Sequence, residues 1–308
     1  MTLQQLEYVV AVNRLRQFAK AAAYCGVTQP TLSAMIQKLE AELGVRLFDR
    51  TAGRVIPTAI GEAVAERAEK TLAMARGIRD LVANEKQKVS GRFRLGILPT
   101  IAPYLLPRFL PQLCATHPEM ELRVVEMKTS DICRAVRQGD LDAAILVRLD
   151  GMEEFSLQTL FYEQFMAYVS RTDKLFTHER IRTSDLNDEY LWLLDEGHCF
   201  RDQLVKFCHL KAAQSSQNTY SLGSIETFMR MVEGGKGITF IPQLALEQFS
   251  SQQREMVRPF AIPVPTREVV LMTRNDFVRD AVSRLLCQSV RAAVPKEMLK
   301  MQREGVRV

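Results

Sequence analysis

The chain has 308 residues, of which 47% are hydrophobic and 25% are charged, so its composition suits an ordinary globular protein of two or three compact units. No run of about 18 uncharged apolar residues occurs, which excludes a transmembrane helix, and the first ten residues lack the features of a signal peptide. We therefore expect a cytoplasmic protein without membrane contact, whose six cysteines are thiols and not a secreted disulfide framework.

The excess positive charge lies near the N-terminus. Residues 1–90 carry 13 Lys and Arg against 9 Asp and Glu, a net charge of +4, whereas residues 91–308 carry 28 against 27, a net charge of +1. A basic module joined to a nearly neutral one fits a polyanion-binding head on a body that senses a small molecule. A merely solvated basic surface would give the same numbers, so charge alone leaves both interpretations open.

Three short helices are predicted within the first 43 residues. After the first, the alanine-rich segment 18–24 predicts a second helix that Gly26 ends. Thr28 is the predicted N-cap of the third, with Pro30 in the first turn, and apolar residues recur at three- and four-residue steps up to Leu43. The second and third helices have the spacing of a helix-turn-helix, with Gly26 in the turn.

The third helix has a polar side that suits DNA recognition. Its candidate DNA-contacting residues are Gln29, Pro30, Thr31, Ser33, Gln37 and Lys38. Small polar side chains at a helix N-terminus reach base edges, and glutamine binds adenine with two hydrogen bonds. Two extended pieces, residues 45–50 and 54–57, predict a hairpin wing whose Arg50 and Arg54 would neutralise phosphates or enter the minor groove. The alternative is a generic helical bundle with a polar face.

A long helix is predicted after Thr58, over residues 59–88, with an apolar stripe along one side. A helix of about 30 residues is too long to be buried by so small a head, so we expect it to pair with its copy in a second subunit.

From Arg92 the chain alternates predicted strands and helices. The predicted strands are 93–98, 121–127, 141–147, 164–169, 190–194, 219–222, 238–241 and 269–272, and the predicted helices are 101–116, 130–138, 201–210, 225–233 and 277–294. Such alternation indicates parallel sheets covered by helices on both faces, which bind ligands at the carboxyl ends of their strands.

The segment AAAYCGVTQPTLSAMIQKLEAELGVRLFDRT resembles the winged-helix head of LysR-type regulators, and the later parts follow that family's order. In the second half, ILPTIAPYLLP, GDLDAAIL, LDEGHCFRDQLVKFC and GGKGITFIP are similar to peroxide-sensing members of the family. The resemblance covers residues 1–294, and the tail 295–308 matches no part of it. The GHCxRDQxxxFC segment is much more specific than the helix-turn-helix.

The resemblance implies an α/β protein in three parts. These are a winged helix-turn-helix domain at 1–58, a dimerising linker helix at 59–89 and a two-lobed, periplasmic-binding-protein-like effector domain at 91–300. The first lobe is expected at 91–162 with 268–300, and the second at 163–267.

Two cysteines are the predicted redox centre. Cys199 lies between His198 and Arg201 at the expected N-terminus of helix 201–210, where positive charge and the helix dipole favour the reactive thiolate and lower its pKa. Its attack on hydrogen peroxide gives a sulfenic acid, which Cys208 converts to a disulfide. Nine helical steps separate the two by about 13–14 Å, whereas a disulfide needs Cα atoms within about 7 Å. The helix must therefore unwind, and that unwinding is the predicted switch.

The resemblance also implies a peroxide pocket in which Thr100 and Thr129, each after a predicted strand, act with His198, Cys199 and Arg201. Threonine hydroxyls there would donate to the leaving oxygen, although an ordinary capping role would also explain them. Asp202 and Gln203 in the same segment are candidates for orienting Cys199 or for stabilising one of the two states. The remaining cysteines have apolar helical neighbours and are expected to be unreactive; they are Cys25, Cys114, Cys133 and Cys287. No CxxC or HxxxH spacing occurs, so no metal or cofactor is expected.

We therefore expect a transcription regulator, not an enzyme, that binds a pseudo-palindromic double-stranded DNA promoter site as a dimer of dimers. Oxidation would change the spacing of the heads, alter recruitment of RNA polymerase and activate antioxidant genes, and a thioredoxin- or glutaredoxin-type reductant would reset the protein. The alternatives are a LysR-type regulator with a small organic effector between the lobes, a thiol peroxidase-like enzyme, and a solute-binding transport protein, which needs a secretion signal.

Overall fold

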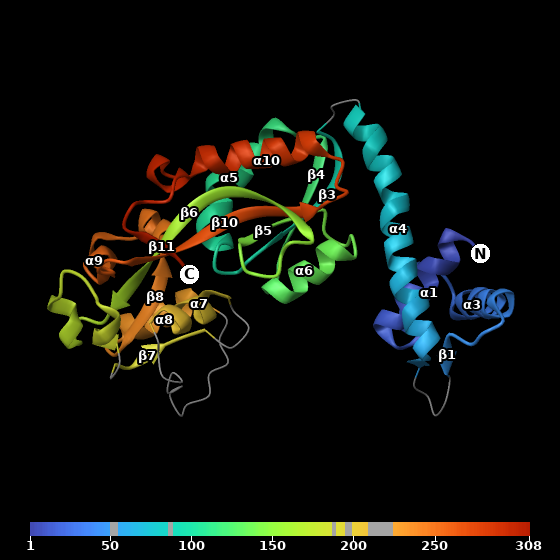
Figure 1. The fold of residues 1–308 in the computed structure, drawn as a ribbon, viewed down its shortest axis with the longest axis horizontal. Helices are drawn as coiled ribbons and strands as arrows, with labels where there is room; N and C mark the ends of the chain where they lie inside the picture. Colours follow the sequence, from blue (N-terminus) through green and yellow to red (C-terminus); the bar gives the residue numbers. More distant parts are fainter. Residues whose placement is uncertain (50–54, 86–88, 187–188, 195–198, 209–223) are drawn as a thin grey trace. The chain divides into compact units, whose positions relative to one another are not determined.

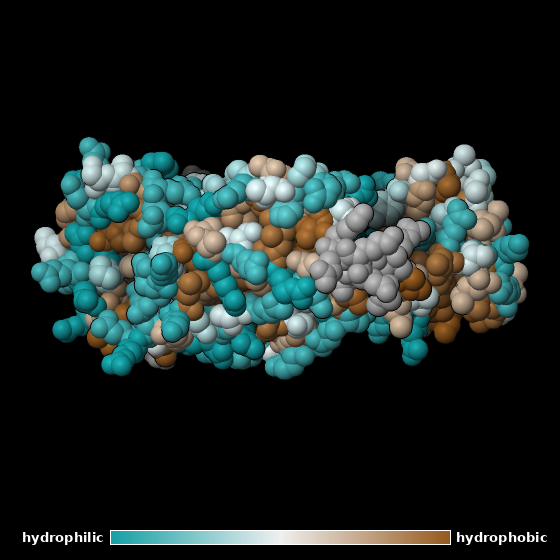
Figure 2. Space-filling view, turned by 90° about the horizontal axis from the view of Figure 1, so that it is seen from above, coloured by the Kyte–Doolittle hydropathy of each residue, from teal (hydrophilic) through white to brown (hydrophobic). Residues whose placement is uncertain are grey.

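The computed structural model describes residues 1–308 except 50–54, 86–88, 187–188, 195–198 and 209–223. The chain forms two compact units, Met1–Lys86 and Gln87–Val308 (Figure 1). Among the described residues, no helix combines the length and the apolar character needed to cross a lipid bilayer. On the face drawn in Figure 2, hydrophilic residues surround separate hydrophobic patches.

Three helices build the first unit as predicted: α1 (Leu3–Leu15), α2 (Phe18–Tyr24) and α3 (Gln29–Leu43). The side chain of Thr28 caps α3 by accepting from the backbone N–H of Thr31, and Gly44 ends the helix at a positive φ of 67°. The apolar positions of α3 are fully buried against the other helices; they are Leu32, Ile36 and Leu39.

The wing and the long helix follow. Strand β1 (Phe48–Asp49) pairs antiparallel with β2 (Ile56–Pro57), and the predicted contact residues Arg50 and Arg54 lie outside the described residues. Helix α4 (Ala59–Glu85) starts after Thr58, whose hydroxyl accepts from the N–H of Gly61 at 3.0 Å. A Cβ atom on Gly61 would lie 1.9 Å from the carbonyl oxygen of Leu47, so only glycine allows α4 to pack this closely.

The second unit is built on a sheet whose described strands follow the order β4-β3-β5-β10-β6-β8-β7, with β11 beside β10 and β9 beside β6. The strands are β3 (Gly91–Ile97), β4 (Met120–Glu126), β5 (Ala143–Val147), β6 (Phe155–Val169), β7 (Leu191–Trp192), β8 (Ile238–Pro242), β9 (Val257–Pro259), β10 (Val264–Arg274) and β11 (Gly305–Arg307). The predicted strand 219–222 lies outside the described residues.

The prediction of purely parallel sheets is wrong. Strand β3 runs parallel to β4 and β5, and β7 parallel to β8, but β10 is antiparallel to β5 and β6, and β6 is antiparallel to β8 and β9. The cause is visible in Figure 1, where β6 and β10 are long neighbouring strands that both extend through the unit. Since the chain leaves the β3–β5 region along β6 and returns along β10, the two must run in opposite directions.

Five helices of the second unit lie close to their predicted positions: α5 (Ala102–Thr116), α6 (Thr129–Arg137), α7 (Cys199–Phe207), α8 (Ile225–Glu233) and α10 (Asp280–Ala293). The short helix α9 (Ser251–Arg254) and the 3-10 turns were not predicted; the turns are η1 (Lys174–Thr177), η2 (Thr183–Leu186), η3 (Gln243–Gln248) and η4 (Lys296–Leu299). Helix α7 begins two residues before its predicted start, and α10 begins three residues after. Helices α5 and α10 pack against each other, whereas α6 packs on β5 and β10.

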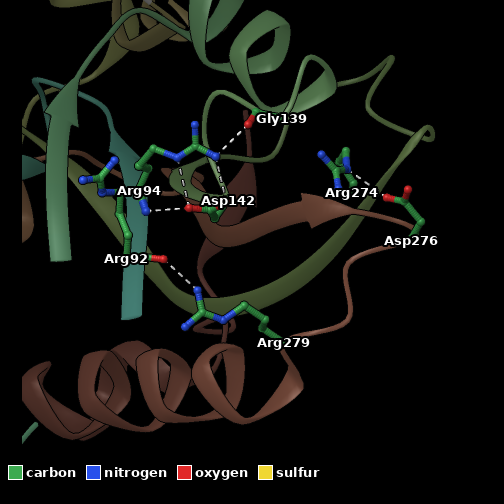
Figure 3. Close-up of polar contacts among 7 residues, drawn as sticks. All are labelled: Arg92, Arg94, Gly139, Asp142, Arg274, Asp276 and Arg279. Carbon is green, nitrogen blue, oxygen red and sulfur yellow. Dashed lines mark hydrogen bonds and ion pairs between the residues drawn. The ribbon is translucent and has the colours of Figure 1, made fainter. Parts of the chain in front are cut away.

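Arginine side chains fix the beginning of the second unit (Figure 3). In β3, Arg94 donates from its guanidinium to both carboxylate oxygens of Asp142, at 3.0 and 3.3 Å. Arg279, only 5% exposed, donates to the carbonyl oxygens of Arg92 at 2.8 Å and Ser90 at 2.6 Å. These bonds tie the segment that enters β3 to the residue before α10.

Candidate functional site

The two predicted redox cysteines lie at opposite ends of helix α7. Cys199 is its first residue, and Cys208 follows its last residue, with the Cys208 N–H donating to the carbonyl oxygen of Leu204 at 2.9 Å. Both thiols are free and buried. Because the segment is helical throughout, nine residue steps place the two Cα atoms about 13–14 Å apart, too far for a disulfide in this conformation.

Cys199 lines a small cavity that also contains two threonines. The cavity has a volume of about 10 Å³ and is lined by Leu98, Pro99, Thr100, Lys128, Thr129, Cys199 and Phe200. Its two threonines are those proposed from the sequence, one after β3 and the other at the start of α6. The hydroxyl of Thr129 is buried without a hydrogen-bond partner among the described residues, and its presence near the sulfur of Cys199 lowers the pKa of that thiol.

A buried arginine that the sequence analysis missed stands behind this cavity. Arg267 of β10 is 1% exposed and donates to the hydroxyl and the carbonyl oxygen of Thr100, both at 3.1 Å. Its guanidinium pairs with the carboxylate of Glu163 in β6 at 2.6 Å and lies 5.1 Å from the ring centroid of Phe200. Arg267 and Glu268 are neighbouring charged residues in the predominantly apolar segment 264–272. They were the available signal in the sequence, because a charge in a buried strand needs a partner.

The pKa of Cys199 is shifted in the direction opposite to the sequence-based expectation. Burial raises the pKa of the Cys199 thiol above its ordinary value, while the nearby hydroxyl of Thr129 and the charge of Arg267 lower it and the carboxylate of Asp202 raises it. The predicted net lowering is therefore wrong for this conformation, since loss of water around the sulfur outweighs the nearby cation. Burial alone raises the pKa of Cys208 to about 12.

The other residues named from the sequence around Cys199 are not among those that line the small cavity in the described part of the chain. His198 lies outside the described residues. Arg201 is in the first turn of α7, with its guanidinium 3.7 Å from the carboxylate of Asp202, and it is not among the described residues that line the small cavity. Gln203 is buried on α7 and contacts the C-terminal segment instead.

A second, larger cavity is also lined by Cys199. It has a volume of about 1520 Å³, and its lining includes Thr129, Arg148, Arg182, Cys199 and Lys206. A small solute can therefore approach the buried sulfur from this cavity. No group of three or more His, Cys, Asp or Glu side chains among the described residues is arranged to hold a metal ion.

The proposed DNA-contacting residues of α3 lie opposite its buried side. Gln29, Pro30, Thr31, Gln37 and Lys38 are exposed, and Ser33 is partly exposed. The side chain of Thr31 is also engaged near the helix start, where its hydroxyl lies 2.9 Å from that of Thr28. Five polar or small side chains on one exposed face can contact a groove without disturbing the core.

Of the four cysteines expected to be unreactive, Cys287 is buried and Cys25 and Cys133 are half-buried. Cys114, in contrast, is exposed on α5. It is a useful comparison for the buried pair, because it reports what an accessible thiol of this chain does.

Two family models match this chain. The bacterial regulatory helix-turn-helix protein of the lysR family matches residues 3–62, and the LysR substrate binding domain matches residues 86–295. A relative from Dickeya chrysanthemi named hydrogen peroxide-inducible genes activator is 34% identical over 305 residues, which cover 99% of this chain and 100% of the relative. The DNA-binding transcriptional dual regulator OxyR of Escherichia coli K12 is 32% identical over 306 residues, 99% of this chain and 100% of the relative.

Solved structures agree with these matches. Full-length OxyR from Pseudomonas aeruginosa, solved as a variant, superposes with a TM-score of 0.75 at 35% identity over 96% of this chain and 99% of that one. OxyR from Porphyromonas gingivalis gives a TM-score of 0.66 at 47% identity over 71% of this chain and 99% of that one. The similarity extends over both units.

Proposed function

This chain belongs to the LysR family of transcriptional regulators, as its motifs predicted, and we propose that it senses hydrogen peroxide through Cys199 and Cys208 and activates antioxidant genes. Relatives that match over nearly the full chain are named hydrogen peroxide-inducible genes activator. The observation that carries the proposal is the position of Cys199, which lines a small cavity with Thr100 and Thr129 at the head of a helix that ends beside Cys208.

The proposed reaction has two steps. The sulfur of Cys199, as thiolate, attacks one peroxide oxygen, the O–O bond breaks, and the departing hydroxide takes up a proton and leaves as water. The sulfur of Cys208 then attacks the sulfenic sulfur of Cys199, the S–O bond breaks, and a second water leaves. Two thiols lose two electrons in total, and one peroxide is reduced to two waters.

The described side chains support the first step. Thr129 and Thr100 line the same cavity as Cys199, and Thr129 lowers the pKa of its thiol. A hydroxyl near the breaking O–O bond stabilises the charge that develops on the leaving oxygen. The guanidinium of Arg267 supplies a fixed positive charge behind Thr100, which favours the thiolate. His198 and Arg201 remain candidates for completing the pocket.

The second step demands a new conformation. The two cysteines stand nine helical positions apart on α7, so the helix must unwind before the sulfurs meet. We propose that this unwinding changes the contacts between effector domains. The heads at 1–58 would be paired through the linker helices at 59–89 in a dimer of dimers. After the change they would take a different spacing on DNA, which would alter recruitment of RNA polymerase. A thioredoxin- or glutaredoxin-type reductant would reset the switch.

Thiol trapping after a micromolar pulse of hydrogen peroxide tests the proposal directly. Mass mapping should find a disulfide between Cys199 and Cys208, and the purified protein should change its contacts on promoter DNA in the same samples. Cys199→Ser should abolish both effects, and Cys208→Ser should stop at a sulfenic acid on Cys199. Cys114→Ser, at an exposed thiol, is the matched control and should behave like the unaltered protein. Two free thiols together with a peroxide response on DNA would refute the proposal.

The volume of the larger cavity favours a second candidate, a LysR-family regulator with a small organic effector. Cys199→Ser separates the two, because a protein that responds to an organic effector keeps its inducer response without this sulfur. Steady multiple turnover of peroxide in the presence of a reductant would instead favour a peroxidase-like enzyme.

A further inference from the structure

The C-terminal segment forms a strand that the proposed function does not use. Strand β11 pairs in parallel with the beginning of β10, so that Gly305 stands opposite Val264. The N–H of Val264 donates to the carbonyl oxygen of Glu304 at 2.8 Å, and the N–H of Val308 donates to that of Thr266 at 3.2 Å. The segment thus reaches the residue that precedes Arg267.

The same segment is bound to the redox helix. Gln203, buried at 5% exposure, donates from its side-chain amide to the carbonyl oxygen of Val308 at 2.6 Å. Gln203 lies four residues after Cys199 and five before Cys208, in the middle of α7. Val308 therefore joins α7 to β10 through one hydrogen bond on each side.

An ion pair strengthens this attachment. Arg307 pairs at 3.1 Å with Glu268 of β10, whose side chain is 4% exposed. Burial raises the pKa of Glu268, but hydrogen bonds from Thr159 and Arg307 together with the charge of Arg148 hold it below its ordinary value. The carboxylate is thus ionised at neutral pH, and the C-terminal segment supplies one of its two counter-ions.

We propose that residues 305–308 act as a latch that holds α7 helical in the reduced protein and is released when the disulfide forms. This inference rests on the proposed peroxide switch. Bringing the Cα atoms of Cys199 and Cys208 from about 13–14 Å to within about 7 Å displaces everything between them. The bond from Gln203 to Val308 cannot persist through that change. A contact present only in the reduced state shifts the equilibrium toward it, and the formation of the disulfide must in turn loosen the latch.

The first test is the redox equilibrium of the full-length protein in dithiothreitol buffers, measured by thiol trapping. Gln203→Met removes the hydrogen-bond donor on α7. Gly305→Val should displace β11 from β10, because a Cβ atom at Gly305 would lie 2.9 Å from the hydroxyl of Thr266. At a fixed buffer ratio, each variant should raise the disulfide-to-dithiol ratio roughly 5- to 10-fold, the effect of one lost hydrogen bond. Arg303→Gln, at an exposed position just before the latch segment and outside both cavities, is the matched control and should leave the ratio unchanged.

The second test needs no variant. Hydrogen exchange of residues 304–308 should be slow in the reduced protein and fast after peroxide treatment. Unchanged ratios in both variants, or equal protection of this segment in both redox states, would overturn the latch while the 199–208 disulfide still forms. A shift in Gln203→Met alone would also overturn it, because the effect would then belong to the helix and not to the strand. Absence of any disulfide in the unaltered protein would overturn both the latch and the proposed function.

Discussion

Arg267 and Thr100 are joined by two hydrogen bonds, from one guanidinium nitrogen to the threonine hydroxyl and from the other to its carbonyl oxygen, both at 3.1 Å. The same guanidinium pairs with Glu163 at 2.6 Å. Arg267 is therefore held rigidly behind a residue that lines the cavity of Cys199. A charge that is fixed before the reaction stabilises a thiolate without the cost of reorganising solvent.

Removing Arg267 should affect both stability and reactivity. Arg267→Met leaves the carboxylate of Glu163 buried without a counter-ion, so the free energy of unfolding should fall by about 3–5 kcal/mol. The double variant Arg267→Met/Glu163→Gln avoids the unpaired charge and should recover most of that loss. Its sulfenic acid formation at Cys199 should still be roughly 10-fold slower, the effect of about 1.4 kcal/mol of lost thiolate stabilisation.

Unfolding of these variants can be followed by the fluorescence of Trp192, the only tryptophan in the sequence. Sulfenic acid formation can be followed by dimedone trapping. If the stable double variant is oxidised as fast as the unaltered protein, Arg267 has only a structural role.

Substitutions at Thr129 test whether its hydroxyl assists the oxidation of Cys199. Thr129→Val keeps the shape of the side chain but removes the hydroxyl that lowers the pKa of Cys199, so oxidation by peroxide should slow by roughly 5- to 10-fold. Thr129→Ser retains the hydroxyl and should react at nearly the original rate. Stopped-flow measurement of peroxide consumption by a single equivalent of protein distinguishes them, and equal rates in the two variants would rule out this role.

The rate of oxidation should increase with pH. Burial raises the pKa of Cys199, so the neutral thiol predominates around pH 7 and the thiolate fraction grows about 10-fold for each pH unit below the pKa. Dimedone labelling rates between about pH 6 and about pH 8 should follow that slope. A flat profile would mean that Cys199 is already a thiolate at neutral pH.

Cys208 should make the folded protein sensitive to alkali. Its pKa is about 12 in the folded protein against an ordinary value of 9.0, so the unfolded chain loses the proton first as the pH rises. The stabilisation is complete below pH 9 and should be lost between about pH 9 and about pH 12. Denaturant titrations of the reduced protein across this range should show that Cys208→Ala loses less stability than Cys114→Ala, whose thiol is exposed. Identical slopes in the two variants would contradict this assignment.

The exposed face of α3 should separate base recognition from phosphate binding. Gln37→Ala should weaken binding to the preferred DNA site, selected from a random library, by about 1–3 kcal/mol and relax the preference at one position. Lys38→Ala should weaken binding to all sequences and lower the slope of log affinity against log salt by about 1. Fluorescence anisotropy at several salt concentrations measures both effects, and a salt slope that Lys38→Ala leaves unchanged would exclude a phosphate contact.

The local elements of this protein could be predicted from its sequence because their signals lie within a few residues. Thr28, Pro30 and Gly44 mark the ends of α3, and its apolar spacing matches the side that is buried. The resemblance of the segment around Cys199 and Cys208 to peroxide-sensing regulators identified the pair, and nine steps along one helix then determine their separation.

The surroundings of Cys199 could not be predicted, because strands distant in the sequence create them. Glu163 and Arg267 stand 104 positions apart and meet only because β6 and β10 are neighbours in the sheet. The alternation of elements did not reveal that these strands run in opposite directions.

The neighbouring residues of Cys199 and the resemblance of its segment to peroxide-sensing regulators identified the candidate thiols, but tertiary packing decided their chemistry. Loss of water around Cys199 raises its pKa more than nearby positive charge lowers it, and that balance depends on burial, which the local sequence does not encode. The contact between Gln203 and Val308 likewise exists only because β11 returns to the edge of β10, which no local pattern in the C-terminal segment indicated.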